Sequence, residues 1–488
     1  MSLVTSIESA SGLLKLLPEF IDLQKIFSPF FDRFPIFLVG GCVRDGILKG
    51  QVGEDLDCVV ESEGGAKEWV HALKEYYPEL FSNPHPLGRE YPIWQIVFDK
   101  SWGSIPKGTR LEVADTQSEM FPDPQTRARV TRFGKINLDA LRRDFSVNAL
   151  YWDFRTQSLQ DPSGLGLQDL GSRTLRSPQP QQKEKNFSDD PLRIVRLFRF
   201  HAQLEFAIDT ETLAAALSVS SRLKILSSER IRDELLKVFK SGRAYQFFKI
   251  INEKDLLSEL FPELIPMVGC TQDARYHSEG DVWVHTLLVM KNADPNPLQQ
   301  LTALLHDVGK PASRTEDGDR IRFLNHEKHS VEIAQKFLKR FKFSADLIDP
   351  VLKITALHLR GSDVELWASS KPARKLLREI GPLKEEFLRF VLADSSSSQR
   401  PDGSFDVQHV QKLAEIFSKI EITHPVTQKY PLSGHEIMKI LDLKPGPQIK
   451  VIQDALREAE DAYLTEHSEA PSPNQLKIWA REAFLKIY

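Results

Sequence analysis

Short apolar runs separated by turn residues characterise the chain between residues 31 and 165. The runs read IFLVGG, DLDCVVE, WQIVFD, TRLEVAD and FSVNALYWDF, and they are rich in the β-branched and aromatic residues that favour strands. Residues 1–30 instead have a helical pattern. The sequence therefore predicts a helical lead-in at 1–30 and a mixed α/β head at 31–165.

Beyond residue 165 the strand signals stop and apolar positions recur at helical spacing. The polar segment SPQPQQKEKNFS, residues 177–188, predicts a loop, and DDPLRIVRLFRFHAQL predicts a helix with Pro191 in its first turn. Helical patterns continue to the C-terminus, with short breaks near 268–280 and 395–405. The predicted fold class is α+β, with a mixed head followed by all-α segments at 166–268, 269–400 and 401–488.

The composition is that of a globular protein with several domains. The chain has 488 residues, of which 41% are hydrophobic and 27% charged, and this length suggests three or four domains. The net charge of 64 − 68 = −4 excludes a general polycation that coats nucleic acid. Residues 183–250 carry 13 basic and 9 acidic residues, so a local excess of 13 − 9 = +4 is compatible with one basic face.

Cysteine usage and the N-terminal sequence indicate a reducing compartment. The three cysteines are too few for a disulfide framework or a Cys-based zinc cluster. The N-terminus has no signal-peptide pattern, and the apolar run IFLVGGCV is far shorter than a membrane span. We therefore expect a cytoplasmic protein without a membrane partner.

A glycine turn follows the first predicted strand in VGGCVRDGILKG. Gly40 and Gly41 precede a helical start, where backbone N–H groups can hold a phosphate. Arg44 lies one turn into that helix and can pair with a triphosphate in a bidentate manner. The alternative interpretation of this pattern alone is an ordinary turn.

Two carboxylates in DLDCVV favour the phosphate-binding interpretation of the glycine turn. Asp55 and Asp57 are two residues apart on a predicted strand, so both side chains project from the same face. Such a pair repels unless a cation lies between the two groups, and Mg²⁺ prefers carboxylate oxygens. Glu112 in RLEVAD is the candidate third ligand from a neighbouring strand. The alternative is an exposed pair of acids without a metal.

An acid and an arginine lie three residues apart in SDDPLRIVRLFRF. We expect Asp190 and Arg193 to share a helix face, where a carboxylate only accepts and a guanidinium only donates hydrogen bonds. Cytosine and adenine each present an amine donor beside a ring-nitrogen acceptor, so this pair could recognise both and reject uracil and guanine. Arg196 and Arg199 continue the basic side toward phosphates. A surface ion pair or a capping aspartate is the alternative.

These motifs together resemble the bacterial class II tRNA nucleotidyltransferase and poly(A) polymerase family, which includes the CCA-adding enzymes. The matching stretches cover about residues 35–240 in family order, and they read LVGGCVRDGILKG…EDLDCVV, LRRDFSVNALYWD, DPSGLGLQDLGSRTLRS, SDDPLRIVRLFRFHAQLEFAID and SSERIRDELLKVF. The resemblance implies a nucleotidyltransferase head at 31–165, a neck and body at 166–268 that read the base and bind RNA, and a helical tail. The segment 431–467 resembles the tail of long members and is a candidate tRNA contact, with an ordinary helix–loop–helix as the alternative.

The resemblance also implies roles for single residues. It assigns Gly41 and Arg44 to the triphosphate, Asp55 and Asp57 to Mg²⁺, and Arg143 of RRDF to the nucleotide. The neck positions of the family correspond to Asp190, Arg193, Arg196 and Arg199. The sequence departs from the family at Asp189, where Glu is usual, and at EVADTQ, where relatives commonly carry a Thr-Phe-Arg run. The second departure adjoins a loop, about 115–135, that is thought to govern the switch from C to A addition.

A separate set of histidines and aspartates lies in the helical part. A lone helical histidine is more often a satisfied core residue than a ligand, but an adjacent His-Asp pair with further imidazole and carboxylate groups suits a divalent metal. The set resembles the HD phosphohydrolase superfamily over about 275–400, within the predicted domain at 269–400. The residues that match its metal ligands are His285, His306, Asp307 and Asp394, with His326 and His358 at additional positions.

We therefore expect an enzyme that extends the 3′ end of tRNA with C and A from CTP and ATP. The tRNA 3′-hydroxyl attacks the α-phosphate, pyrophosphate leaves, and Mg²⁺ is held by Asp55, Asp57 and Glu112. A second divalent metal in the HD domain is a further expectation, and no obligatory protein partner is evident.

Three alternatives remain open. A poly(A) polymerase, or an enzyme that adds only CC or only A, would use the same head. A phosphohydrolase that works through its HD domain would have a vestigial head, against which the intact Gly-Gly, Asp-x-Asp and Asp-x-x-Arg sets argue. A non-catalytic RNA-binding module is disfavoured, because binding alone does not need paired carboxylates.

Overall fold

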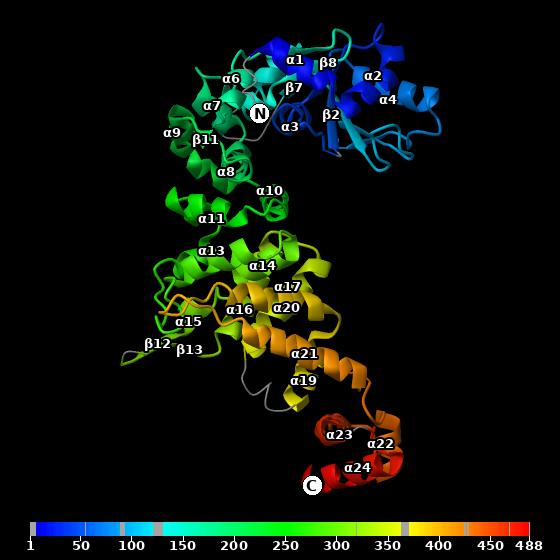
Figure 1. Cartoon of the computed structure of the whole chain (residues 1–488), viewed down its shortest axis with the longest axis vertical. Helices are drawn as coiled ribbons and strands as arrows, with labels where there is room; N and C mark the ends of the chain where they lie inside the picture. The colour runs from blue at the N-terminus through cyan, green and yellow to red at the C-terminus, as the bar shows by residue number, and fades with distance from the viewer. Residues whose placement is uncertain are drawn as a thin grey trace. The chain divides into compact units, whose positions relative to one another are not determined.

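The computed structural model divides into two compact units, residues 1–227 and 228–488, each of which is described by itself (Figure 1). The structure describes residues 6–53, 55–87, 93–120, 130–318, 320–362, 370–423, 426, 429–467 and 469–487. The loop expected to govern the C-to-A switch falls partly outside these ranges, at 121–129. Within the described ranges, no helix combines the length and the apolar character needed to cross a lipid bilayer.

The head is built on a mixed sheet of seven strands. In the order of their pairing, these are β3 (His85–Leu87), β4 (Ile93–Val97), β5 (Arg110–Asp115), β2 (Asp55–Val60), β1 (Ile36–Val39), β8 (Tyr151–Asp153) and β9 (Ser158–Gln160). Only β2 and β5 run parallel to each other, and the other neighbours are antiparallel. A separate hairpin joins β6 (Gln117–Met120) to β7 (Val130–Phe133).

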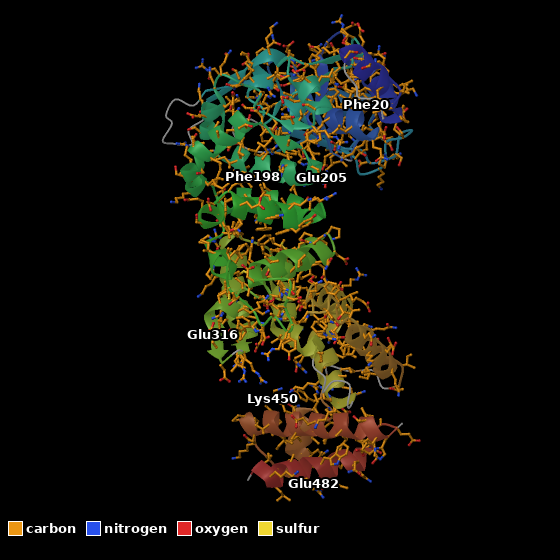
Figure 2. All side chains as sticks on the ribbon, turned by 60° about the vertical axis from the view of Figure 1, so that its left-hand side comes forward. Phe20, Phe198, Glu205, Glu316, Lys450 and Glu482 are labelled. Atoms are coloured by element: carbon orange, nitrogen blue, oxygen red, sulfur yellow. The ribbon has the colours of Figure 1, made fainter. Side chains whose placement is uncertain are left out.

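Helices cover the sheet through a core of large aromatic side chains. The helices are α1 (Ile7–Lys15), α2 (Pro18–Phe27), α3 (Gly41–Lys49) and α4 (Gly65–Tyr76). Phe20 of α2, which is labelled in Figure 2, packs edge-on against Trp152 with ring centroids 5.4 Å apart. Phe27 packs in the same manner against Trp69 of α4, at 4.8 Å. These contacts fix α2 against β8 and against α4.

The neck follows the head as helices α7 (Lys183–Asp189), α8 (Leu192–Leu204) and α9 (Thr210–Ser218). The helix expected after Pro191 is confirmed, since Pro191 is the N-cap of α8. Figure 2 shows Phe198 within α8 and Glu205 at its C-terminal end. The loop expected at 177–188 is wrong over its second half, because α7 begins at Lys183.

The second unit is almost entirely helical. Its first helices are α10 (Ser228–Lys240) and α11 (Ala244–Glu253). A bundle follows, in which Figure 1 shows α13 (Val282–Asn292), α14 (Pro297–Leu305), α16 (His326–Arg340), α17 (Ala345–Leu357) and α20 (Lys384–Ser395) packed together. The last helices are α19 (Ser370–Ile380), α21 (Gln408–Thr423), α22 (Gly434–Leu441), α23 (Pro447–Glu466) and α24 (Pro473–Ile487).

The predicted α/β head and helical remainder are confirmed, with two small corrections beyond residue 165. A parallel pair of two-residue strands joins β10 (Thr174–Leu175) to β11 (Ala207–Ile208). A hairpin joins β12 (Arg314–Asp317) to β13 (Arg320–Phe323), with short α15 (Lys310–Ser313) before it. These segments are too short, or too exposed, to produce a strand pattern in the sequence.

A buried carboxylate, Asp139 on α5 (Ile136–Leu141), holds one edge of the head together. Its Oδ1 accepts hydrogen bonds from the backbone N of Gln117 at 2.9 Å and from Nε of Arg142 at 2.8 Å. Its Oδ2 accepts from the Tyr151 hydroxyl at 2.6 Å and from Nη2 of Arg143 at 3.0 Å. Asp139 therefore fixes Arg143 relative to the start of β6.

The same contacts set the charge of Asp139. Burial raises the pKa of this carboxyl, but attraction to Arg143 and Arg142 and hydrogen bonds from Tyr151 and Gln117 outweigh burial and lower the pKa to about 2. Because the folded-state pKa lies below the ordinary value of 3.8, the carboxylate stabilises the head above about pH 4. That contribution is lost as the pH falls from about 4 toward 2.

Asp139→Asn is expected to lower the free energy of unfolding of the head by about 2 kcal/mol or more at neutral pH, because two half-buried guanidinium groups lose their buried carboxylate. The measurement is denaturant unfolding between pH 2 and pH 7, with Asp32→Asn, at a fully exposed carboxylate, as the control. The wild-type stability should fall between pH 4 and pH 2 more steeply than that of Asp139→Asn. Equal slopes for the two proteins would contradict this role.

Candidate active site and HD metal cluster

Three carboxylates meet on neighbouring strands of the head. Along β2, Leu56 and Cys58 are buried while Asp55 and Asp57 face outward, as the two-residue alternation predicts. The parallel register of β2 and β5 sets Asp57 opposite Glu112. Glu112 is further held from β4, where Nε2 of Gln95 donates to its Oε1 at 3.1 Å. The sequence prediction that these three acids share one site therefore agrees with the strand register.

The Gly40–Gly41 turn lies directly against these acids. Gly40 has φ +78°, and a Cβ at this position would lie 3.3 Å from Oδ2 of Asp57 and 3.8 Å from Nη1 of Arg143. A side chain would therefore be strained in its backbone conformation and crowded by the carboxylate. Helix α3 begins at Gly41, so the N-terminus of a helix lies beside the carboxylates.

The electrostatics of the three acids favour an added cation. Close packing of protein around Asp57 raises the pKa of its carboxyl to about 6, with the negative charges of Glu112 and Asp55 adding to the rise and Arg143 opposing it. Arg110, opposite Asp55 on β5, donates from Nε to Oδ1 of Asp55 at 2.6 Å. An all-oxygen donor set with unbalanced negative charge and a glycine in contact fits a divalent cation such as Mg²⁺.

The arginines expected to contact the nucleotide are each tied to a partner. Nη1 of Arg44, a buried residue on α3, donates to Oδ1 of Asn148 at 2.6 Å, and its Nε donates to Asp45 at 2.7 Å. Arg143 is held by Asp139 and Tyr151. Arg196 of the neck donates from Nε to Oδ2 of Asp144 at 2.8 Å, so a carboxylate of the RRDF segment anchors α8. Burial opposes ionisation of Asp144, but Arg196 and Asn148 hold its pKa well below the usual range.

The expectation that Asp190 and Arg193 share a helix face needs correction. Asp190 precedes the N-cap of α8 and has extended backbone angles, because the residue before a proline avoids the helical region. Its Oδ1 accepts from the backbone N of Leu192 at 3.2 Å, which is the capping contact weighed as an alternative. Nη1 of the buried Arg193 donates to the carbonyl of Asn186 at 2.7 Å, and its Nη2 donates to the carbonyl of Arg142. Further along α8, Nη1 of Arg199 donates to Oε1 of Gln203 at 2.7 Å.

The histidines of the HD set converge on Asp307 in the second unit. Oδ2 of Asp307 lies 3.1 Å from Nε2 of His306 and 3.6 Å from Nε2 of His285. Its Oδ1 lies 3.1 Å from Nε2 of His326 and 3.7 Å from Nε2 of His358. Oδ1 of Asp394 lies 3.0 Å from Nε2 of His285. All six predicted residues thus form one cluster, and the four histidines and Asp307 are almost fully buried.

The hydrogen bonds behind the histidines point their Nε2 atoms inward. Each Nδ1 lies within 2.9 Å of an oxygen that only accepts: the carboxylate of Glu279 for His285 and backbone carbonyls for His306, His326 and His358. Each Nδ1 therefore donates, and a ring that carries no second proton presents its Nε2 lone pair to the centre. The Nε2 atoms of His326 and His358 lie 3.3 Å apart, and two facing lone pairs require a proton or a cation between them.

The sequence analysis assigned no role to several residues of these sites. They are Asp139, Asp144 and Tyr151 beside the head site, although the last two lie in the matching stretch LRRDFSVNALYWD, and Glu279 and Lys310 beside the HD cluster. Nζ of Lys310 lies 2.7 Å from Oδ2 of Asp307, and it donates to Oε1 of Gln272 at 2.7 Å. The one available signal was that Lys310 follows Asp307 by three residues, across the turn between α14 and α15.

Family models match three parts of the chain. Residues 36–176 match the poly A polymerase head domain, and residues 283–393 match the HD domain. Residues 205–267 match a model described as a probable RNA and SrmB-binding site of polymerase A. The match to the poly A polymerase head domain contains the head carboxylates, and the match to the HD domain contains His285, His306, Asp307, His326 and His358.

Curated relatives and solved structures agree with these matches. The chain is 29% identical over 436 residues to an A-adding tRNA nucleotidyltransferase of Deinococcus radiodurans, covering 86% of this chain and 90% of the relative. It is 32% identical over 339 residues to a multifunctional CCA protein of Actinobacillus pleuropneumoniae, covering 66% of this chain and 75% of the relative. The fold is similar to that of the Bacillus stearothermophilus CCA-adding enzyme in complex with CTP, with a TM-score of 0.67 and 19% identity over 96% of this chain and 98% of that one. The chain belongs to the tRNA nucleotidyltransferase and poly(A) polymerase family and carries an HD domain.

Proposed function

We propose that this enzyme adds C and A from CTP and ATP to the 3′ end of tRNA without a nucleic-acid template. The observation that carries the proposal is the set of three carboxylates on β2 and β5, Asp55, Asp57 and Glu112, against a glycine turn, with Asp57 opposite Glu112. Support comes from the names of the relatives, which add A or act as CCA proteins, and from the related structure with CTP.

The head residues divide the chemical tasks. Asp55, Asp57 and Glu112 would hold divalent cations, and such an ion lowers the pKa of an attacking hydroxyl and neutralises charge on a triphosphate. The backbone N–H groups at Gly40 and Gly41, with Arg44 and Arg143, bind and orient the triphosphate. The tRNA 3′-hydroxyl then attacks the α-phosphate, and pyrophosphate leaves.

The neck selects the base in this proposal. The Asp190 carboxylate accepts from the exocyclic amine of cytosine or adenine, and Arg193 donates to the ring nitrogen beside it. The carbonyls of Asn186 and Arg142 hold the Arg193 guanidinium in a fixed orientation. Arg196 and Arg199 lie farther along α8 and bind phosphate groups.

We propose the domain limits as a head at 31–165, a neck and body at 166–268, an HD domain at 269–400 and a tail at 401–488, after a lead-in at 1–30. The basic excess in residues 183–250 and the match of residues 205–267 to an RNA-binding model support an RNA path through the neck and body. Binding that depends on phosphate contacts weakens as the salt concentration rises.

The test is incubation with tRNA transcripts that end in -N, -C, -CC and -CCA, with single nucleoside triphosphates, followed by sequencing of the 3′ ends. We expect C addition to the first two and A addition to the third. Asp55→Ala should lower incorporation by about a thousandfold or more while the circular dichroism spectrum is unchanged, because a cation ligand is lost. Glu79→Ala, at an exposed acid of the same head, is the control.

The other outcomes discriminate the alternatives. Long A tails would identify a poly(A) polymerase, and addition of only CC or only A would identify a partial enzyme. Undiminished incorporation by Asp55→Ala would reject the assignment of the metal ligands.

The HD cluster supports a second function, metal-dependent hydrolysis of phosphoesters. The supporting observation is the inward orientation of four imidazole Nε2 atoms around Asp307, which suits a transition metal. Burial and the neighbouring His306 lower the pKa of His358 to about 4, so this ring is neutral and available as a ligand at neutral pH. His285, His306, Asp307 and Asp394 are the proposed ligands, with His326 and His358 on the other carboxylate oxygen.

Asp307→Asn is expected to abolish binding of Mn²⁺ or Ni²⁺ to the second unit, because this carboxylate contacts all four histidines. The measurement is the metal content after equilibrium dialysis, together with the metal-induced shift in melting temperature. Glu263→Gln, whose carboxylate pairs with Arg340 on the same unit, is the matched control. Nucleotide addition should persist in both variants. A wild-type protein that retains no transition metal would refute the cluster as a metal site.

A further inference from the structure

Three arginine side chains of the proposed nucleotide site gather around one phenylalanine ring, that of Phe200. The Cζ atom of Arg199 lies 3.9 Å from the ring centroid, that of Arg44 lies at 5.2 Å, and that of Arg196 lies at 5.6 Å. All three distances are within the range of cation–π attraction. Phe200 itself is only 6% exposed, so the contacts are shielded from water.

The three guanidinium groups come from two parts of the first unit. Arg44 is on α3, directly after the glycine turn of the head, whereas Arg196 and Arg199 are on α8 of the neck. Phe145, next to the RRDF aspartate, packs edge-on against Phe200 with centroids 5.8 Å apart. Phe200 is itself a residue of α8, the proposed base-reading helix. Its ring therefore contacts arginines of its own helix and Arg44 of α3, the proposed phosphate-binding helix.

Polar groups hold these cations from other directions. Arg44 donates to Asp45 and Asn148, Arg196 donates to Asp144, and Arg199 donates to Gln203. The negative face of the Phe200 ring attracts the guanidinium groups in addition to these polar contacts, and it does not remove the positive charge that a triphosphate would meet.

We propose that Phe200 is a positioning residue that sets Arg44, Arg196 and Arg199 in one arrangement before the nucleoside triphosphate binds. This inference rests on the proposed nucleotidyltransferase function. Arginine side chains that are already ordered lose less conformational freedom on binding, so the ring increases affinity without contacting the nucleotide. It also couples the phosphate contact at Arg44 to the orientation of the neck helix.

The test is calorimetric measurement of CTP and ATP binding, in the presence of Mg²⁺, to the wild type and to Phe200→Leu. Leucine keeps an apolar side chain but removes the aromatic face. We expect Phe200→Leu to raise the dissociation constant for both nucleotides by about tenfold. We also expect it to raise KM for incorporation more than it lowers kcat. Phe198→Leu is the matched control, because Phe198 is fully buried on the same helix. It should lower the melting temperature without changing the nucleotide affinity.

A double-mutant cycle separates positioning from general packing. If Phe200 acts through the arginines, Phe200→Leu combined with Arg199→Met should bind CTP no more than about twofold more weakly than the weaker single variant. Independent effects that multiply in the double variant would overturn the inference, as would unchanged affinity in Phe200→Leu. A wild type that binds CTP but incorporates no nucleotide would instead reject the proposed function.

Discussion

The parallel pairing of β2 with β5 is the constraint on which the head site depends. This register places Asp57 opposite Glu112, whereas a shift of one residue would turn the whole outward set of β2 to the opposite face of the sheet. The strand β1 pairs on the other side of β2 and ends at Val39, so the glycine turn that follows lies beside the same carboxylate. Burial raises the pKa of Asp57 to about 6, and the negative charges of Glu112 and Asp55 add to this rise while Arg143 opposes it.

The arginines around that site are held in place by buried polar groups. Each is fixed by a separate buried group: Arg143 by Asp139, Arg196 by Asp144, and Arg44 by Asn148. Arg110, in contrast, donates directly to the exposed Asp55. The tethers therefore keep positive charge beside the acids without neutralising them. Long-range contacts of this kind link the sheet, α3 and α8 into one unit.

Sequence patterns predicted the arrangements that follow from local backbone geometry. The alternation of Asp55 and Asp57 fixed their common face, and the expected neighbour Glu112 lies opposite Asp57. The patterns missed groups that become adjacent only in the folded chain, such as Phe200 and Arg44, or Glu279 and His285. The prediction that Asp190 shares a helix face with Arg193 was wrong for a local reason, since Pro191 prevents the preceding residue from joining the helix. The β12–β13 hairpin was missed because its strands are exposed and charged, although Asp317-Gly318 between them is a typical turn pair.

The two candidate metal sites differ in the chemistry of their donors, and this difference keeps them independent. In the head, the proposed ligands are carboxylates on exposed or half-buried strand positions, which suit a hard cation that arrives with a triphosphate. In the HD cluster, four buried imidazoles are oriented by hydrogen bonds to carbonyls and to Glu279, an arrangement that suits a softer ion retained between reactions. The proposed roles of the two sites therefore differ: the carboxylates of the head are suited to a cation that enters with each substrate, and the buried imidazoles are suited to a metal that stays bound.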